Sequence, residues 1–446
     1  MNDKKTKKNS LVVAVVIFLV LTGYCYIAGL SMVIPLLVVF YGFHLVVFKK
    51  LSVGRLVQIG LLLTLILALS YGMSRYYQFN PYLIPVTSIA MLTMLLFGDI
   101  QLAFMMAFLS AVLASLVVGM DLDYMIVIFL GGLSGAYAVR EARTRATLLT
   151  AGFVVGAVQI LAYFLLHPQL TKAVFAGCMG PLALNGLLSA GAVLATLKVF
   201  EILFGELTNF SLLELSDSLH QPLLKRLAFE APGTYHHSLV VSNLAGAAAD
   251  AIGTNALLVR VGAYYHDVGK LVKPEYFNEN QSINANKHDD LEPSMSRLVI
   301  LNHVKEGVEL ARKHHLSEKL VAFIEQHHGT SLIHYFYQKA LEDGAVNELG
   351  EETYRYPGPR PQSREVALVM LADSVEGATR SIDEHTPTRI DEVVRKIINN
   401  KFIDGQLDEC NLTLREIETI CESFSRTLSA MYHVRVKYPN PRKDAH

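Results

Sequence analysis

The first half of the chain is dominated by long apolar runs that contain no charged side chain. A helix needs about 20 apolar residues to cross the hydrocarbon core of a bilayer. The run from Ser10 to Phe48 is long enough for two such helices, with Gly29–Ser31 as the expected turn between them. Further runs bring the predicted number of membrane spans to eight; they cover residues 56–74, 76–98, 100–120, 124–139, 146–171 and 173–197.

From about Thr208 onward, charged residues recur among the apolar ones at the spacing of amphipathic helices. Two segments fit a capping box at a helix start, Ser211–Glu214 and Thr413–Glu416. Pro232-Gly233 predicts a turn, and Thr234 is the expected cap of the helix that follows. The alternating pattern of a half-buried strand is missing over any useful length. The sequence therefore predicts an all-α fold.

The charged residues are divided unevenly along the chain. Residues 11–200 carry 9 Lys or Arg and 4 Asp or Glu, out of 39 and 40 in the whole sequence. A bilayer core excludes charge, whereas a domain in water needs it. We therefore expect a multi-span helical membrane domain over residues 1–204, in contact with the lipid bilayer, and an all-helical domain in water over residues 205–446.

Lys and Arg in short loops predict the orientation of the membrane domain, because these residues concentrate on the cytoplasmic side. Basic residues precede the first span at positions 4–8 and recur in the segments 49–55 and 140–145. The intervening loops hold little beyond Arg75 and Lys172. The N-terminus is thus expected inside, and eight spans return the charged domain to the cytoplasm.

Composition disfavours two classes of function. A transporter of ions usually carries ionisable residues within its spans, but the predicted spans hold only His44 and His167 as candidates. A nucleic-acid-binding protein usually has a basic stripe, and none is present, so no DNA or RNA polymer is expected as a partner. The four cysteines form no CxxC pair, which disfavours a disulfide framework or a thiolate zinc site.

Histidine and aspartate side chains of the second domain form the candidate site. The pairs His266-Asp267 and His327-His328 each end an apolar helical segment, and Gly269 is the expected cap after the first pair. Asp373 lies among apolar residues, where a carboxylate needs a partner. Imidazoles and carboxylates together suit divalent transition metals, and seven of them are enough for two adjacent ions. The candidate ligands are His237, His266, Asp267, His303, His327, His328 and Asp373.

A second His-Asp pair, His288-Asp289, lies in a polar stretch beside Asn286 and Lys287. Such a dipeptide is common and carries no spacing to other ligands. We interpret it as loop surface or as a cap at a helix entry, outside the metal site.

With these motifs the sequence resembles the HD-domain phosphohydrolase superfamily, whose ligand pattern is H…HD…H…HH…D. It is most similar to the membrane-bound seven-transmembrane HD proteins of bacteria, the PgpH type of cyclic-di-AMP phosphodiesterase. The resemblance covers essentially all of residues 205–446. The stretches that carry it are Glu230–Ser238, Val261–Lys270, His327–Ser331, Tyr356–Pro359 and Gly405–Cys410.

The resemblance implies a hydrolase of the inner bacterial membrane that opens cyclic di-AMP, a cyclic dinucleotide, to linear pApA. It implies two divalent transition-metal ions, Mn or Fe, held by the seven residues above. Asp267 would bridge the two ions and Lys270 would balance the charge of the phosphate. One departure concerns the first two spans: members of this type carry a large extracellular domain between them, where this sequence has only the turn near Gly29–Ser31.

Two alternatives stay open. The same chemistry could act on another nucleotide, although Gly329-Thr-Ser-Leu after the His pair differs from the Gly-Tyr-Pro signature of the cyclic-di-GMP branch. The domain could also be a catalytically inactive signalling module that only binds a nucleotide. The complete ligand set argues against the second alternative.

Overall fold

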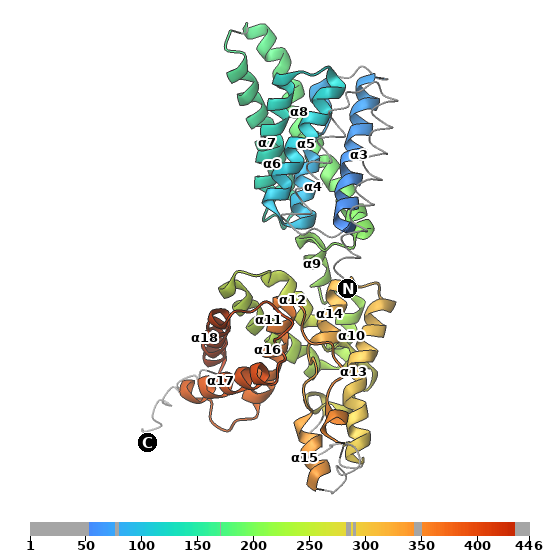
Figure 1. The fold of residues 1–446 in the computed structure, drawn as a ribbon, viewed down its shortest axis with the longest axis vertical. Coiled ribbons are helices and arrows are strands. Elements are labelled where there is room, and N and C mark those ends of the chain that lie inside the picture. The colour runs from blue at the N-terminus through green and yellow to red at the C-terminus, as the bar shows by residue number, and fades with distance from the viewer. Residues whose placement is uncertain are drawn as a thin grey trace, which may run out of the picture. The chain divides into compact units, whose positions relative to one another are not determined.

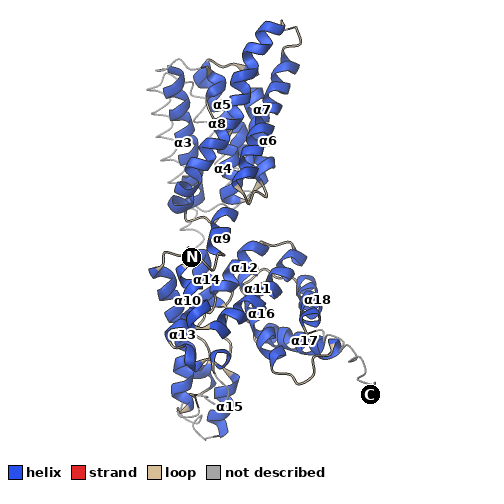
Figure 2. Cartoon of the chain, turned by 180° about the vertical axis from the view of Figure 1, so that it is seen from behind, coloured by secondary structure: helices blue, strands red, loops and turns tan. Residues whose placement is uncertain are grey.

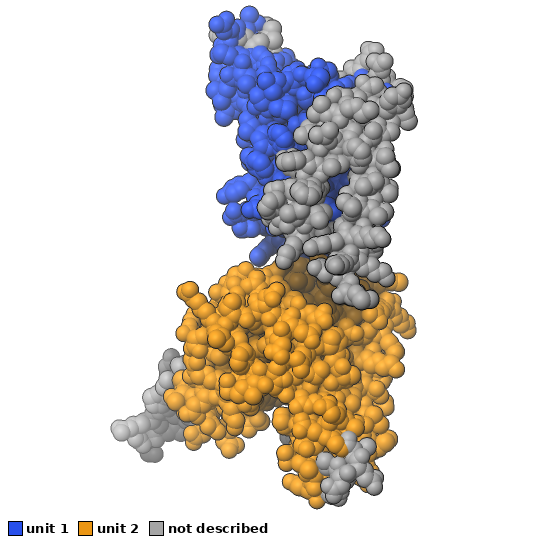
Figure 3. Space-filling view, in the orientation of Figure 1, with its two compact units in different colours: residues 1–210 blue, residues 211–446 orange. Residues whose placement is uncertain are grey.

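The computed structural model describes residues 53–75, 80–169, 171–281, 287–288, 291–342 and 350–432. These residues form α-helices, short 3-10 helices and loops, and they contain no strand (Figures 1 and 2). The predicted all-α fold class is therefore confirmed. The chain divides into two compact units, residues 1–210 and 211–446 (Figure 3).

The described part of the first unit is a bundle of apolar helices (Figure 1). Five of its helices contain segments long and apolar enough to cross a membrane. Large apolar side chains on their outer faces, such as Phe153 and Leu165, are exposed, as expected where lipid surrounds a helix. The elements are α3 (Val53–Arg75), η1 (Pro81–Leu83), α4 (Ser88–Phe97), α5 (Ile100–Val118), α6 (Leu122–Val139), α7 (Arg145–Leu166) and α8 (Lys172–Phe204).

The predicted span over residues 76–98 is not one continuous helix. Its described part consists of η1, an irregular connection and the ten-residue α4. Pro81 and Pro85 explain the break, because proline cannot donate an amide hydrogen and disfavours helix in the residue before it. The carbonyl groups of Tyr82 and Ile84 instead accept hydrogen bonds from the Asn185 side chain on α8, at 2.7 and 2.8 Å. The prediction of a continuous helix was wrong here.

The broken segment nevertheless passes across the bundle. Phe97, at the end of α4, stacks on Phe204, at the end of α8, with ring centroids 6.3 Å apart. At the opposite end, Tyr124 near the start of α6 donates a hydrogen bond to the carbonyl of Pro81, at 3.2 Å. The segment 81–97 therefore joins the alternating up-and-down order of the neighbouring helices.

Several sequence predictions fall outside the described residues. They are the two spans within residues 10–48, their turn at Gly29–Ser31, the inside N-terminus and the environment of His44. They remain predictions, as does the expected domain boundary between residues 204 and 205.

The second unit is built around α11, which packs against α12, α16 and α18. Helix α12 in turn contacts α14 and α16, so that the ends of α12 and α14 lie beside the middle of α16. The described elements of this part of the chain are α9 (Asn209–Leu215), α10 (Pro222–Glu230), α11 (Pro232–Ile252), α12 (Ala256–Tyr265), η2 (Val268–Val272), η3 (Pro274–Tyr276), η4 (Asn278–Asn280), α13 (Pro293–Lys313), α14 (Glu318–Gln326), α15 (His334–Glu342), η6 (Glu351–Tyr354), α16 (Arg364–Arg380), α17 (Pro387–Ile403) and α18 (Leu414–Met431).

The helix starts agree only in part with the predicted caps. Thr413 forms the predicted capping box with Glu416 at the start of α18. Ser211 is not a cap, because α9 begins before it. Thr234 also lies inside a helix, in the first turn of α11, and its hydroxyl donates a hydrogen bond to the carboxylate of Glu279 at 3.1 Å. Both caps were predicted wrongly because the helices start earlier than the polar residues suggested.

Gly269 is not the helix cap that the sequence suggested. Helix α12 ends at Tyr265, and Gly269 lies within η2, which packs against α13. A Cβ atom added to Gly269 would collide with the carbonyl oxygen of His303 and with the amide nitrogen of Gly307. The missing side chain therefore allows the segment after His266-Asp267 to approach the helix that carries His303.

We expect Gly269→Ala to destabilise the second unit by about 1–3 kcal/mol, because the collision involves backbone atoms that cannot rotate away. Thermal unfolding should shift down by roughly 2–4 °C for each kcal/mol in a unit of this size. Gly377→Ala in the interior of α16 is the matched control, since no heavy atom lies within 4 Å of its added Cβ. That variant should unfold at the same or a higher temperature. Equal shifts in the two variants would contradict the close approach.

Candidate metal centre

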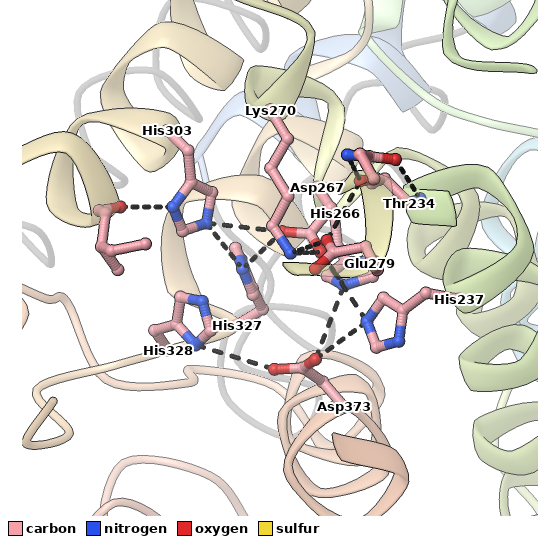
Figure 4. Close-up of polar contacts among 12 residues, drawn as sticks. Thr234, His237, His266, Asp267, Lys270, Glu279, His303, His327, His328 and Asp373 are labelled. Carbon is pink, nitrogen blue, oxygen red and sulfur yellow. Dashed lines mark hydrogen bonds and ion pairs between the residues drawn. The ribbon is translucent and has the colours of Figure 1, made fainter. Parts of the chain in front are cut away.

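All seven predicted ligands lie together in the second unit (Figure 4). Five helices position them, and two of the contributions come from helix ends, where the chain turns away and leaves side chains directed inward. His237 lies on α11, His266 and Asp267 follow α12, His303 lies on α13, His327 and His328 follow α14, and Asp373 lies on α16.

The candidate ligands form two groups, and within each group the ligand atoms lie within 4.8 Å of one another. Six of the seven residues are buried or nearly so, and the side chain of His328 is 21% exposed. The cluster is thus closed on most sides and open beside His328. One group contains Asp267, His303, His327 and His328, and the other contains His237, His266 and Asp373.

Asp267 faces both groups. Its Oδ1 lies 3.4 Å from Nε2 of His303 and 3.6 Å from Nε2 of His327. Its Oδ2 lies 3.2 Å from Nε2 of His266 and 3.7 Å from Nε2 of His237. Two atoms that each lie about 2.0–2.2 Å from one ion are at most about 4.4 Å apart. Each oxygen can therefore share an ion with the imidazoles that it faces, as a bridging carboxylate must.

Asp373 closes the other side of the cluster in the same manner. Its Oδ1 lies 3.0 Å from Nε2 of His237 and 3.9 Å from Nε2 of His266. Its Oδ2 lies 3.7 Å from Nδ1 of His328. Two carboxylates thus connect the two groups of imidazoles.

Two buried atoms of the cluster have no hydrogen-bond partner among the described residues, Nε2 of His266 and Oδ1 of Asp267. A buried polar atom without a partner costs about 1–3 kcal/mol, and native structures keep such atoms where a ligand completes the site. Both atoms point to the centre of the cluster. The donor set and these two atoms therefore fit divalent metal ions.

Three imidazoles are oriented by the backbone. Nδ1 of His266, His303 and His327 each contacts the carbonyl oxygen three residues earlier, at 2.7, 2.5 and 2.8 Å. A carbonyl oxygen only accepts, so the proton of each ring lies on Nδ1. Nε2 is then free of a proton and faces the centre, which is the tautomer that binds a metal.

Glu376 orients His237, and the sequence prediction missed it. Its Oε2 lies 2.7 Å from Nδ1 of His237, and the carboxylate is buried. Asp373 and Glu376 are three residues apart on α16, a spacing that places both on one face of a helix. That spacing was the signal that could have identified Glu376 from the sequence.

Burial and charge shift the pKa values of three histidines of the site, and not all in the same direction. Burial lowers the pKa of His303 to about 4 and holds the pKa of His328 well below its usual value. These rings are neutral at pH 7 and able to bind a metal. Burial also lowers the pKa of His237, but Asp373 and Glu376 outweigh this effect and raise it to about 10. Metal binding at His237 must therefore release a proton.

Lys270 lies between two carboxylates. Its Nζ is 2.7 Å from Oδ2 of Asp267 and 2.7 Å from Oε1 of Glu279. Burial disfavours the charged amine, but the two carboxylates outweigh burial and raise the pKa of Lys270 above its usual value. Glu279 was not predicted, because it lies in a short 3-10 turn with no spacing relation to the motifs.

His288 lies outside the two groups, but it is not the surface residue that the sequence suggested. Its side chain is 5% exposed, and Nε2 is 2.7 Å from the carbonyl oxygen of Tyr276. Its ring packs against that of Phe336, with centroids 5.1 Å apart. Aromatic residues from distant segments cover it, and local polarity could not indicate this. Asp289 lies outside the described residues.

Comparison with known families identifies both parts of the chain. Residues 9–208 match the family described as 7TM receptor with intracellular HD hydrolase. Residues 234–378 match the HD domain family. The first match and the five long apolar helices make this a multi-pass membrane protein.

Two curated relatives match most of the chain. The chain is 39% identical over 393 residues to the cyclic-di-AMP phosphodiesterase PgpH of Bacillus subtilis, which covers 86% of this chain and 55% of the relative. It is 39% identical over 367 residues to PgpH of Listeria monocytogenes, covering 81% of this chain and 51% of the relative. The chain thus spans about half the length of the curated relatives that it matches.

A solved HD-domain structure is also similar in sequence to this chain. The crystal structure of the L. monocytogenes PgpH HD domain in complex with cyclic di-AMP is 48% identical in sequence. The match covers 49% of this chain and 100% of that chain, with a TM-score of 0.46.

Proposed function

This chain belongs to the family of 7TM receptors with an intracellular HD hydrolase, and we propose that it opens cyclic di-AMP to linear pApA at the inner face of the membrane. The observation that carries the proposal is the geometry of Asp267 and Asp373, since each carboxylate faces imidazoles of both groups. The relatives named cyclic-di-AMP phosphodiesterase support the choice of substrate.

The seven clustered side chains would hold two divalent ions, and their nitrogen and oxygen donors without thiolate favour Mn or Fe. Ions bound there would lower the pKa of a shared water and neutralise charge on the phosphate oxygens. Asp267 would help to hold both ions, because its two oxygens face different imidazoles. Lys270 offsets part of the negative charge of Asp267 and Glu279, which reduces their repulsion of an anionic substrate. The domain boundary between residues 204 and 205 is part of the same proposal.

The orientation in the bacterial inner membrane is also part of the proposal. Reporter fusions after Thr144 and after Gly205 should give cytoplasmic signals, since the basic segment 140–145 precedes α7 and the metal centre follows α8. A fusion after Gly119, between α5 and α6, should give an external signal and serves as the control. An external signal from either of the first two fusions would refute the orientation.

The substrate is tested by turnover of the whole chain in detergent, with added Mn, on cyclic di-AMP, cyclic di-GMP and a linear alarmone. We expect cyclic di-AMP to be hydrolysed fastest, with pApA as the product. Faster turnover of another nucleotide would reassign the substrate within the same chemistry. Tight binding of cyclic di-AMP without turnover would support an inactive signalling module instead.

A further inference from the structure

A cavity of about 600 Å³ lies in the second unit, and its wall includes Ser331, Arg355, Ser374 and Lys401. Ser374, which directly follows Asp373 on α16, lines the cavity, and so does Ser331, which lies three residues beyond His328. His328 is also the most exposed side chain of the cluster. The cavity wall therefore contains close neighbours in the chain of two candidate ligands, Asp373 and His328.

Lys401 of α17 lines this cavity, and its ammonium has no counter-charge. Its Nζ donates a hydrogen bond to the hydroxyl of Ser331 at 2.7 Å, and it forms no ion pair with any described carboxylate. Arg355 in the same wall differs, since carboxylates of Glu351 and Asp404 lie 2.7 and 3.0 Å from its guanidinium. Among the described residues that line the cavity, Lys401 is therefore the basic residue without an ion-pair partner.

Lys401 is only partly exposed, and partial burial of an ammonium without an anionic partner costs free energy of folding. Burial lowers the pKa of Lys401, and the carboxylate of Asp373 is the first of the charges that oppose this effect. Asp373 is thus close enough to act on Lys401 electrostatically, although the two side chains form no ion pair. A bound anion beside the metal centre would supply the missing counter-charge. The hydroxyls of Ser331 and Ser374 in the same cavity are suitable donors to such an anion.

We propose that Lys401 binds the second phosphate of the cyclic dinucleotide, the one that is not cleaved, while the first lies at the metal centre. This inference rests on the proposed function, because it requires a substrate with two phosphates. Ser331 holds the ammonium in position through its hydroxyl. The chemistry recognised is a phosphodiester anion, and the subsite would favour cyclic dinucleotides over substrates with a single phosphodiester.

The test compares Lys401→Met with Lys396→Met in the whole chain. Methionine preserves the length of lysine and removes the charge, and Lys396 is an exposed lysine on the same helix. The kcat/KM is measured for cyclic di-AMP and for bis(p-nitrophenyl) phosphate, which has one phosphodiester, together with bound metal and thermal unfolding.

Lys401→Met should lower kcat/KM for cyclic di-AMP by on the order of tenfold to a hundredfold, mainly through KM, since it removes a charged hydrogen bond to bound substrate. The loss for the single phosphodiester should be at least about tenfold smaller. Metal content should persist, and the unfolding temperature should not fall, because the variant removes an uncompensated charge. Lys396→Met should preserve the ratio of the two kcat/KM values.

Equal losses on both substrates would overturn the subsite, as would no loss on either. A changed preference between cyclic di-AMP and cyclic di-GMP, without weaker binding of both, would assign the cavity to a base and also overturn it. If the unmodified chain hydrolyses neither substrate, the proposed function fails. The subsite is then decided by the Kd of cyclic di-AMP for the Mn-loaded chain, which Lys401→Met must raise.

Discussion

Asp267→Ala is expected to reduce hydrolysis of cyclic di-AMP below about a thousandth of the unmodified rate, more than the 10–100-fold that residues behind metal ligands usually cost. The reason is the position of its carboxylate, whose oxygens face His303 on one side and His266 on the other, at 3.4 and 3.2 Å. Alanine removes the carboxylate that both ion positions would share. It also removes one of the two carboxylates that contact Lys270. Initial rate and metal bound per chain should therefore fall together.

Two histidine variants are the controls for this loss. His236 is exposed beside the buried His237, so His236→Ala should keep both metal content and rate. His288→Ala should keep the metal but lower thermal stability, because its buried ring packs against Phe336. Metal loss in His288→Ala as deep as in Asp267→Ala would mean that the wrong His-Asp pair has been assigned.

Removal of metal should have the second largest effect. Exhaustive chelation is expected to reduce turnover of the whole chain to background, since the positive charges left in the cluster, on Lys270 and His237, are each paired with two carboxylates. Mn or Fe should restore the rate better than Mg, because five of the seven donors are imidazoles and Mg prefers oxygen. The measurement is the initial rate before and after treatment and after each addition. Full activity in a chain stripped of metal would refute the metal-dependent mechanism.

The parts of the site that the sequence could predict are those with a local pattern. His266-Asp267 and His327-His328 were identified because each pair ends an apolar helix, and α12 and α14 do end at Tyr265 and Gln326. Asp373 was identified because a carboxylate among apolar residues needs a partner. In each case the physical reason lies within about ten residues of the chain, which is the length of one helix.

The missed features depend on contacts between distant segments. Glu279 contacts Lys270 from a 3-10 turn, and Lys401 lines the neighbouring cavity from α17; no spacing links either residue to a ligand. The burial of His288 arises from Tyr276 and Phe336 in the same way. Other errors were local: proline chemistry breaks the segment 81–97, and helices that begin early place Thr234 inside a first turn.

The two-ion site itself is tested most directly by titrating Mn into the chelator-treated chain and following bound metal and pApA formation in the same sample. Two groups of ligands, both faced by Asp267, predict a rate that rises with occupancy and reaches its maximum at about two ions per chain. A maximal rate at one ion per chain, or pApA formed by a chain without bound metal, would contradict it.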